Sequence, residues 1–387
     1  LPVSCSQTIL AVGGQLKGVF ALGRGQQALP SHHLGDLDHL DAYQAFERDV
    51  ELYTTLFKSQ PEVIVHDLHP DYASTHYARQ YAVAHGIRRL AVQHHHAHVA
   101  SCMADNGLNE PVIGIAFDGT GFGTDRAIWG GEFLVGNYEG FTRAAHLRYV
   151  RMPGGEKAID QPWRMAEVYL ADAGLPSLEH SYEVSTEQRG TIRQLMQRGF
   201  NSPWTSSAGR LIDAVAAMIG LRQQVSFEGQ AAMELEWLAT EVNDDSSYPF
   251  ALESEAFERE RPMVVDTRPL IAEVAEEVRR ATPAAVIARR FHNTIVELIS
   301  QVCQRIRTTT GIESVALSGG VFQNALLASG VRARLGKRCF RVYAHQQVPA
   351  NDGGLSLGQI AIAAAMIQRD CAHDHTRPTV ASSSCEA

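Results

Sequence analysis

Short apolar runs alternate along the chain with longer segments in which apolar residues recur at helical spacing. The short runs are rich in β-branched residues and end near glycine or a carboxylate, so they predict strands. Residues 112–117 are almost continuously apolar, which is typical of a strand buried on both faces. Strands that alternate with helices in this way indicate an α/β fold. The predicted strands span residues 9–12, 18–22, 63–67, 90–93, 112–117, 314–317 and 341–344, and the predicted helices span residues 40–60, 72–85, 96–105, 208–220, 269–281, 284–308 and 357–369, with another from about residue 323.

The length and composition predict two lobes. With 387 residues, of which 45% are apolar, the chain is long enough to form more than one hydrophobic core. We expect an N-terminal lobe over residues 1–150 and a C-terminal lobe over residues 151–356. The helix at 357–369 is expected to pack back on the N-terminal lobe, and the polar residues 370–387 are expected to form a disordered tail.

The charge balance and the cysteine pattern exclude several classes of protein. The 34 Lys and Arg residues against 43 Asp and Glu residues give a net charge of −9, which is opposite to the basic surface that nucleic acid requires. No apolar run reaches the roughly 18 residues of a membrane span. The six cysteines contain no C-x-x-C pair, which favours a reducing cytoplasm over a disulfide scaffold. Because the chain opens at Leu1 rather than Met, we expect it to be a piece of a longer protein.

A cluster of histidines directly follows the predicted strand at 90–93. His94 and His98 are four residues apart, so both imidazoles project from one face if the segment is helical, as metal chelation requires. His95 and His98 are three residues apart and could also share a face, and spacing alone does not choose between the two pairs. A polar turn with solvated histidines is the alternative interpretation.

Two carboxylates are placed to complete a metal site. Asp118 follows the buried strand at 112–117, at the end of the strand where open α/β sheets bind ligands. Asp352 precedes two glycines in another turn. Each carboxylate could instead cap a helix or close an Asx turn. Together with His94 and His98 they form a mixed nitrogen and oxygen set that suits iron or zinc and suits magnesium poorly, without separating iron from zinc.

Glycine-bearing turns that follow strands predict a nucleotide site. Such turns let backbone N–H groups approach phosphate oxygens, and we expect Gly119, Thr120 and Gly121 to do so. None of the turns matches a Rossmann or P-loop signature, so their distribution favours a nucleotide held in a cleft between two lobes. Asp213 could accept a hydrogen bond from a ribose or be solvated. Arg164, in a Pro- and Gly-rich segment, could hold an anion or belong to a solvated loop.

In combination these motifs resemble the C-terminal, Kae1-like half of the hydrogenase maturation carbamoyltransferases of the HypF family. The resemblance covers nearly all of residues 8–365. It implies a two-lobed, actin-like and hexokinase-like (ASKHA) fold, in which RNase H-like lobes enclose a nucleotide and a metal. The stretches that carry it lie at residues 11–17, 67–72, 92–98, 117–124, 129–132, 152–164, 227–232, 318–324 and 351–359.

The resemblance also implies roles for particular residues. It makes His94, His98, Asp118 and Asp352 the metal ligands and the catalytic set, around one divalent iron or zinc ion. The residues expected to hold the nucleoside are Asp213, Gly229, Gly319, Gly320 and Asn324.

The implied reaction is transfer of a carbamoyl group from carbamoyl-adenylate to the C-terminal cysteine of a HypE-type partner. The product is a thiocarboxamide, the precursor of the cyanide ligand of [NiFe]-hydrogenase. Full-length relatives use ATP and carbamoyl phosphate, with Mg²⁺ possible on the nucleotide. The N-terminal YrdC-like module of the family is absent from this sequence, so we expect the adenylation step to occur elsewhere.

Three alternatives stay open at this stage. One is an O-carbamoyltransferase or a threonylcarbamoyl-transfer protein of the same fold. Another is a sugar or acetate kinase, which would use Mg²⁺ alone and leave the histidines without a role. The third is a metal-binding scaffold without catalysis.

Overall fold

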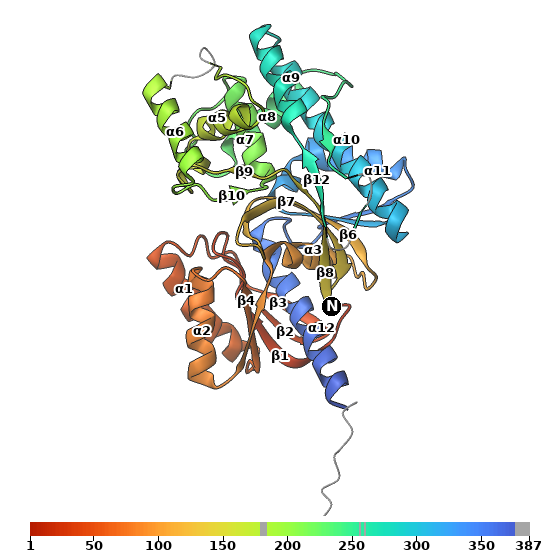
Figure 1. Ribbon diagram of the computed structural model, residues 1–387. Helices are drawn as coiled ribbons and strands as arrows, with labels where there is room; N and C mark the ends of the chain where they lie inside the picture. Colours follow the sequence, from red (N-terminus) through yellow and green to blue (C-terminus); the bar gives the residue numbers. More distant parts are fainter. Residues whose placement is uncertain (179–183, 255–256, 259–260, 376–387) are drawn as a thin grey trace, which may run out of the picture.

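The computed structural model describes residues 1–178, 184–254, 257–258 and 261–375, and it shows two β-sheets with helices around and between them (Figure 1). The fold is the α/β class expected from the sequence. Within the described part of the chain, no helix has both the length and the apolar character that a bilayer span needs.

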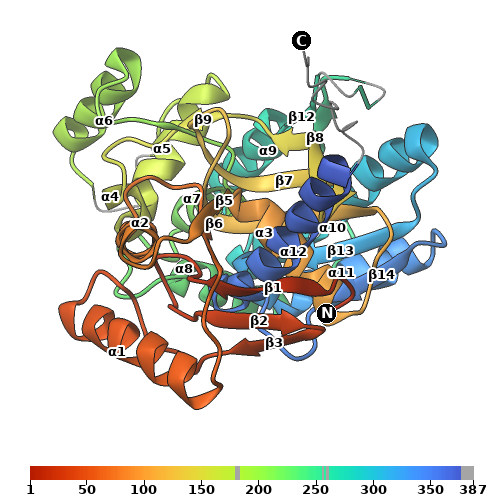
Figure 2. The same cartoon turned by 90° about the horizontal axis from the view of Figure 1, so that it is seen from below.

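The first sheet has five strands, in the order β3-β2-β1-β4-β5. Strands β1, β2 and β3 form an antiparallel meander, whereas β4 and β5 run parallel to β1. Helices α1 and α2 lie on the outer side of this sheet (Figures 1 and 2). The elements are β1 (Cys5–Ala11), β2 (Ala21–Gly25), β3 (Gln27–Pro30), α1 (Leu40–Leu56), β4 (Val63–Asp67), α2 (Ala73–His85) and β5 (Arg88–Val92).

The second sheet repeats the path of the first. Its central strands run in the order β8-β7-β6-β13-β14, again an antiparallel meander followed by two parallel strands. Two short strands, β12 and β11, extend the sheet beyond β8, and two others, β10 and β9, branch from β7. The repeat places the carboxyl ends of β4, β6 and β13 around one region of the molecule. The strands are β6 (Val112–Phe122), β7 (Ile128–Asn137), β8 (Gly140–Leu147), β9 (Val150–Arg151), β10 (Trp204–Thr205), β11 (Ala251–Leu252), β12 (Met263–Asp266), β13 (Ser314–Ser318) and β14 (Arg341–Ala344).

A second group of helices packs around this sheet, and its apolar faces form the largest core cluster of the described residues. In α10 and α9 the buried residues recur at helical spacing, so each helix presents one apolar face to this core. These helices are α4 (Lys157–Asp160), α5 (Pro162–Asp172), α6 (Thr186–Arg198), α7 (Ala208–Met218), α8 (Gln230–Thr240), α9 (Arg268–Arg279), α10 (Ala284–Thr310) and α11 (Ala325–Gly336), with the 3₁₀ turns η1 (Gly320–Gln323) and η2 (Asp352–Gly354).

Two helices lie between the sheets, α3 (His94–Asp105) and α12 (Leu355–His375). Their apolar residues share one core cluster with residues of β1, β4 and β6. The two helices approach closely at Gly358, where an added Cβ would lie 1.9 Å from the backbone oxygen of Ala97. Glycine is therefore required at this contact, and the contact fixes the start of α12 against the histidine helix.

The structure differs from the expected organisation in three places. The boundary predicted at residue 150 divides strands that belong to a single sheet, because β6 pairs with β13 and β8 pairs with β12. Strands β3, β7 and β8 were not expected from the pattern. Helix α12 continues through residues 370–375, which were assigned to a disordered tail, and residues 376–387 of that tail lie outside the described residues.

Candidate metal and nucleotide site

Helix α3 carries the histidine cluster and begins at His94, two residues earlier than the pattern predicted. Gln93 caps it, since the side chain of Gln93 accepts a hydrogen bond of 2.8 Å from the backbone N–H of His96. The early start places His94 and His98 on the same face, with ring centroids 4.8 Å apart. Both side chains are buried, at 0% and 1% exposure.

The two carboxylates approach these histidines from different elements. Asp118 lies in the irregular stretch of β6 between Phe117 and Gly121, where the regular pairing with β7 is interrupted. Its Oδ1 accepts hydrogen bonds from the backbone N–H of Gly119 (2.8 Å) and of Gly320 (3.1 Å), so Oδ2 faces the histidines. Asp352 opens the η2 turn just before α12.

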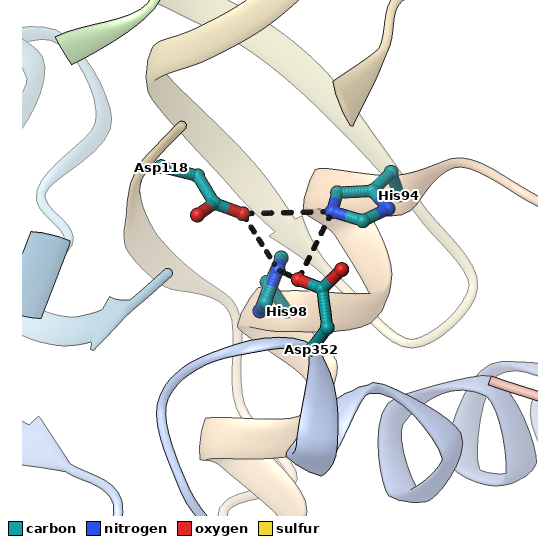
Figure 3. A group of neighbouring side chains, drawn as sticks. All are labelled: His94, His98, Asp118 and Asp352. Carbon is teal, nitrogen blue, oxygen red and sulfur yellow. Dashed lines mark ion pairs between the residues drawn. The ribbon is translucent and has the colours of Figure 1, made fainter. Parts of the chain in front are cut away.

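The four side chains meet at one point (Figure 3). Nε2 of His98 lies 3.0 Å from Oδ2 of Asp118 and 3.4 Å from Oδ1 of Asp352. Nε2 of His94 lies 3.5 Å and 3.7 Å from the same two oxygens. One potential ligand atom from each residue lies within 4.8 Å of every other, although the residues span more than two thirds of the sequence.

The atoms that face one another here lack other partners. Nε2 of His94, Nε2 of His98 and Oδ2 of Asp118 are buried, and beyond these contacts with one another none has a hydrogen-bond partner among the described residues. Buried polar atoms are normally satisfied, so three such atoms that face one another form a place where a bound cation would give each atom a partner. Two imidazole nitrogens and two carboxylate oxygens are a donor set that fits zinc or iron.

Neighbouring charges shift the acid–base behaviour of the cluster. Burial disfavours the charged imidazoles, but the carboxylates of Asp67, Asp118 and Asp352 outweigh it and raise the pKa of His94 well above its usual value. Burial is likewise outweighed at His98, whose pKa is also raised. The same imidazoles, against the effect of burial, hold the pKa of Asp118 well below its usual value. A cation bound here would replace protons.

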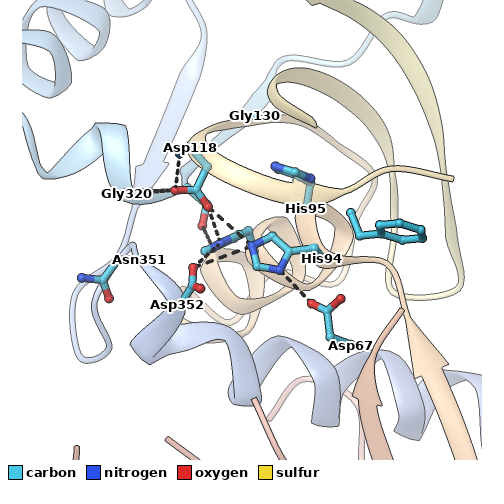
Figure 4. A network of polar contacts seen from close by, with 12 residues as sticks. Asp67, His94, His95, Asp118, Gly130, Gly320, Asn351 and Asp352 are labelled. Carbon is cyan, nitrogen blue, oxygen red and sulfur yellow. Dashed lines mark hydrogen bonds and ion pairs between the residues drawn. The ribbon is translucent and has the colours of Figure 1, made fainter. Parts of the chain in front are cut away.

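His95 points away from the carboxylates (Figure 4). Its ring lies near Trp129 and against Gly121, where an added Cβ would come within 2.4 Å of the His95 ring. Burial and the charge on His94 lower the pKa of His95 well below its usual value. Of the two pairs that spacing left open, the structure brings His94 and His98, rather than His95 and His98, to the carboxylates.

Sequence reasoning missed Asp67, which lies on the side of His94 that faces away from Asp118 and Asp352 (Figure 4). Asp67 ends strand β4 with 0% exposure, and its Oδ2 lies 2.7 Å from Nδ1 of His94. A carboxylate in this position accepts a hydrogen bond from Nδ1–H of the imidazole and leaves Nε2 free to bind a metal. The available signal was a carboxylate at the carboxyl end of a buried strand, the same signal that singled out Asp118.

His98 has a weaker support on its far side. Oγ of Ser318 lies 3.5 Å from Nδ1 of His98 and 2.8 Å from Nε2 of His345. Burial lowers the pKa of His345 to about 4, so this histidine is neutral near pH 7. His94 and His98 are therefore held differently, one by a carboxylate and the other through a hydroxyl.

A cavity of about 340 Å³ opens beside the cluster. Asp118 and Asp352 form part of one wall, and an apolar part of the lining comes from α7 and α8 at Ile212, Met233 and Trp237. Among the residues expected to hold a nucleotide, those that line this cavity are Gly119, Asp213, Gly229, Gly320 and Asn324.

Three of the expected nucleotide residues do not line the cavity: Thr120, Gly121 and Gly319. Thr120 lies half-buried in the irregular part of β6, and Gly121 packs against the histidine rings. Gly319 approaches the backbone of Phe117 and donates its N–H to the oxygen of Ala350 at 2.9 Å.

Polar side chains in the cavity are already ordered by neighbours. Asp213 accepts hydrogen bonds from Arg210, with Oδ2 2.8 Å from Nε, and burial raises its pKa despite that pairing. Asn324 caps α11 through a 2.8 Å hydrogen bond from the backbone of Leu327. Its amide nitrogen lies 3.1 Å from Nε2 of His292. Arg164 instead lies in the first turn of α5, donates to the side chain of Gln161 at 2.6 Å and does not line the cavity.

Two family models match the chain. The model described as "HypF Kae1-like domain" matches residues 4–105, and the one described as "Carbamoyltransferase, Kae1-like Domain, second subdomain" matches residues 114–359. The interval between them falls between α3 and β6, where the structure passes from the first sheet to the second.

Relatives and solved structures agree with these matches. Carbamoyltransferase HypF of Synechocystis sp. is 38% identical, over 93% of this chain and 48% of the relative. A carbamoyltransferase HypF homolog of Cupriavidus necator is 36% identical, over 92% of this chain and 91% of the relative. A crystal structure of full-length HypF in the phosphate- and nucleotide-bound form superposes with a TM-score of 0.88 at 40% identity, over 95% of this chain and 47% of that one. The chain thus spans about half the length of the full-length HypF proteins that it matches.

Proposed function

The chain belongs to the HypF carbamoyltransferase family, and we propose that it binds carbamoyl-adenylate and transfers the carbamoyl group to a cysteine thiolate of a HypE-type acceptor protein. The observation that carries the proposal is the convergence of His94, His98, Asp118 and Asp352 at one end of a cavity large enough for a nucleotide. The chain's structural neighbour with bound phosphate and nucleotide supports a nucleotide as the occupant.

The four converging residues are proposed to hold one divalent iron or zinc ion. Their orphaned atoms, His94 Nε2, His98 Nε2 and Asp118 Oδ2, fit such an ion because each would gain a partner on binding. A cation bound there would act as a Lewis acid toward a phosphate or carbonyl oxygen. Asp67 would hold the His94 ring in the tautomer that binds metal.

In the proposed reaction the acceptor thiolate attacks the carbamoyl carbon. A C–S bond forms, the C–O bond to the phosphate breaks, and AMP leaves with the electron pair. Because AMP is a stable anion, the step needs no strong general acid from the protein. The contribution of the chain is then mainly positioning: Asp213 and Asn324 are proposed to hold the nucleoside, and the apolar face of α8 to exclude water.

The transfer is proposed to be direct, without a cysteine of this chain as carrier. No cysteine among the described residues lines the cavity. Burial raises the pKa of Cys5 to about 11 and that of Cys102 to about 12, and buried Cys303 is shifted in the same direction, so these thiols are poor nucleophiles. A free acceptor thiol has a pKa of about 8.5, so it is only partly ionised near neutral pH.

The supply of carbamoyl-adenylate is assigned to residues outside this chain. Full-length relatives are about twice as long as the part matched here. We propose that the YrdC-like module of the full-length proteins makes the adenylate from ATP and carbamoyl phosphate, with Mg²⁺ on the nucleotide. The thiocarboxamide product is proposed to lead to the cyanide ligand of [NiFe]-hydrogenase. A thiol acceptor requires a reducing compartment, so we place the reaction in the cytoplasm.

A single-turnover assay tests the proposal. Metal-loaded protein is mixed with carbamoyl-adenylate and the acceptor, and thiocarboxamide on the acceptor is measured by mass spectrometry. We expect product with the unmodified chain and a large loss with Asp352→Asn, while the exposed control Arg222→Ala retains it. If Asp352→Asn forms as much thiocarboxamide as the unmodified chain, this carboxylate is not required for the reaction. If the carbamoyl group is transferred to a hydroxyl acceptor and not to the thiol, the proposed acceptor is wrong.

A further inference from the structure

The cavity that we assign to an anionic nucleotide carries an excess of acidic over basic side chains in its lining. Among the described residues that line it, acidic side chains outnumber basic ones by three, so an adenylate phosphate would meet a negative surface. The basic residues are Lys17 and Arg210, and the acidic residues are Asp118, Asp213, Glu228, Glu236 and Asp352.

Most positive groups in the cavity already have partners within the protein. Arg210 is buried and pairs with Asp213 through two of its nitrogens, at 2.8 Å and 2.7 Å. The backbone N–H groups of Gly119 and Gly320, which could otherwise receive a phosphate, both donate to Asp118. Apart from the cation proposed for the cluster, Lys17 is therefore the basic side chain of the described lining that can meet a phosphate.

Lys17 is held at the edge of the metal cluster by its own turn. It lies between β1 and β2 with a backbone φ of +51°, which is uncommon for a residue with a side chain. Its N–H donates to Oδ1 of Asp36 at 2.8 Å. The same turn contains Gly14, where an added Cβ would lie 3.3 Å from Oδ2 of Asp352. The turn thus brings the lysine beside a carboxylate of the cluster.

The ammonium group of Lys17 pairs across the cavity with Glu228, which precedes α8 on the other lobe. Lys17 is 27% exposed at its side chain, whereas Glu228 is 53% exposed. An ion pair with so exposed a partner contributes little to stability, since water screens it. The Glu228 carboxylate can therefore be released to water at a small cost in free energy. The Lys17 ammonium can then pair with a phosphate instead.

We propose that Lys17 is the phosphate-binding residue of this cavity and that an incoming nucleotide phosphate displaces Glu228 from it. The inference rests on the nucleotide site of the proposed function and adds a determinant of ligand specificity. Lys17 distinguishes an adenylate from a neutral nucleoside, and the ion pair with Glu228 holds the lysine in place between turnovers.

Binding measurements separate this role from a structural one. AMP and adenosine are titrated calorimetrically into metal-loaded protein, as the unmodified chain and as Lys17→Ala, Lys17→Arg and Glu228→Gln. Arg222→Ala, which breaks an exposed ion pair with Glu234 outside the cavity, is the matched control. We expect Lys17→Ala to weaken AMP binding by about tenfold to a hundredfold and to leave adenosine binding unchanged. Lys17→Arg should restore most of the loss, and Glu228→Gln should bind AMP as well as the unmodified chain or better.

Three results would overturn the inference. One is AMP binding that is unchanged in Lys17→Ala. Another is an equal loss of AMP and adenosine binding, which would make Lys17 a structural residue. The third is a loss in Glu228→Gln as large as that in Lys17→Ala, which would show that the pair itself matters. The binding measurement does not depend on carbamoyl transfer. If Lys17→Ala weakens the binding of AMP but not of adenosine, and yet the chain transfers no carbamoyl group, the proposed function is wrong and the role of Lys17 in phosphate binding stands.

Discussion

Asp67→Asn offers a sharp test of how the histidines of the proposed metal site are held. The carboxylate of Asp67 is fully buried, and its Oδ2 lies 2.7 Å from Nδ1 of His94. An amide in its place still accepts the hydrogen bond that Oδ1 receives from the N–H of His69 at 2.8 Å. On the side of His94, however, the amide presents an N–H group. Nδ1 of His94 must then accept, and its proton moves to Nε2, the atom that faces the cluster.

The expected consequence is weaker metal binding in an intact fold. Loss of such a supporting carboxylate typically reduces metal affinity by about tenfold to a hundredfold. The assay is a competition titration with a chromophoric chelator, and circular dichroism verifies the fold. Asp49→Asn is the matched control, since Asp49 is a buried carboxylate in α1, outside the cluster. An affinity for Zn²⁺ equal to that of the unmodified chain, with the fold retained, would refute the reasoning.

Three further predictions address the ligands, the pH response and the packing. Purified protein should hold one tightly bound metal equivalent, and His98→Ala should lose it; many weak equivalents that survive the substitution would instead indicate metal buffering. Burial lowers the pKa of His292 to about 4, so the unfolded chain binds an extra proton between that value and about 6.5. The free energy of unfolding therefore falls by up to about 3 kcal/mol as the pH falls through this window. Denaturant titrations of His292→Gln should show a shallower pH dependence than those of the unmodified chain. Gly358→Ala places a Cβ against the oxygen of Ala97 and should destabilise the fold by about 1–3 kcal/mol, whereas Gly336→Ala, whose Cβ would meet nothing within 4 Å, should not; equal midpoints for the two variants would contradict the packing argument.

The sequence was most informative where a strand ends and a helix begins. Strand β4 was predicted with its observed bounds, and β6 and β13 were predicted from their first residues onward. The reason is physical: strands buried on both faces need continuous apolar runs, and the turns after them need polar or small residues. Residues that act at strand ends, such as Asp118, are therefore visible in a sequence.

Other features depended on pairing that a local pattern does not record. Strands β7 and β8 contain glycine and polar residues, among them Glu132 and Arg143, which pair with each other in the structure. Their apolar positions therefore give a weak strand signal, and the lobe boundary was placed after them at residue 150.

The support of the site was hidden for a similar reason. Asp67 at a strand end and Lys17 in a turn are residue types that are common in such places. Their roles follow from partners distant in sequence, His94 for Asp67 and Glu228 for Lys17. Gly121 was expected to approach a phosphate, yet in the structure it makes room for two imidazoles. Spacing can therefore nominate the ligands of the site, whereas the groups that orient them become visible only through tertiary contacts.

A crystal structure of the zinc-loaded protein with AMP, recorded at the zinc absorption edge, would test the central claim most directly. We expect one anomalous peak about 2.0–2.2 Å from Nε2 of His94, Nε2 of His98 and an oxygen each of Asp118 and Asp352, with the AMP phosphate on the same side of the cavity. A peak elsewhere, or a peak held by the histidines with either carboxylate turned away, would contradict the account.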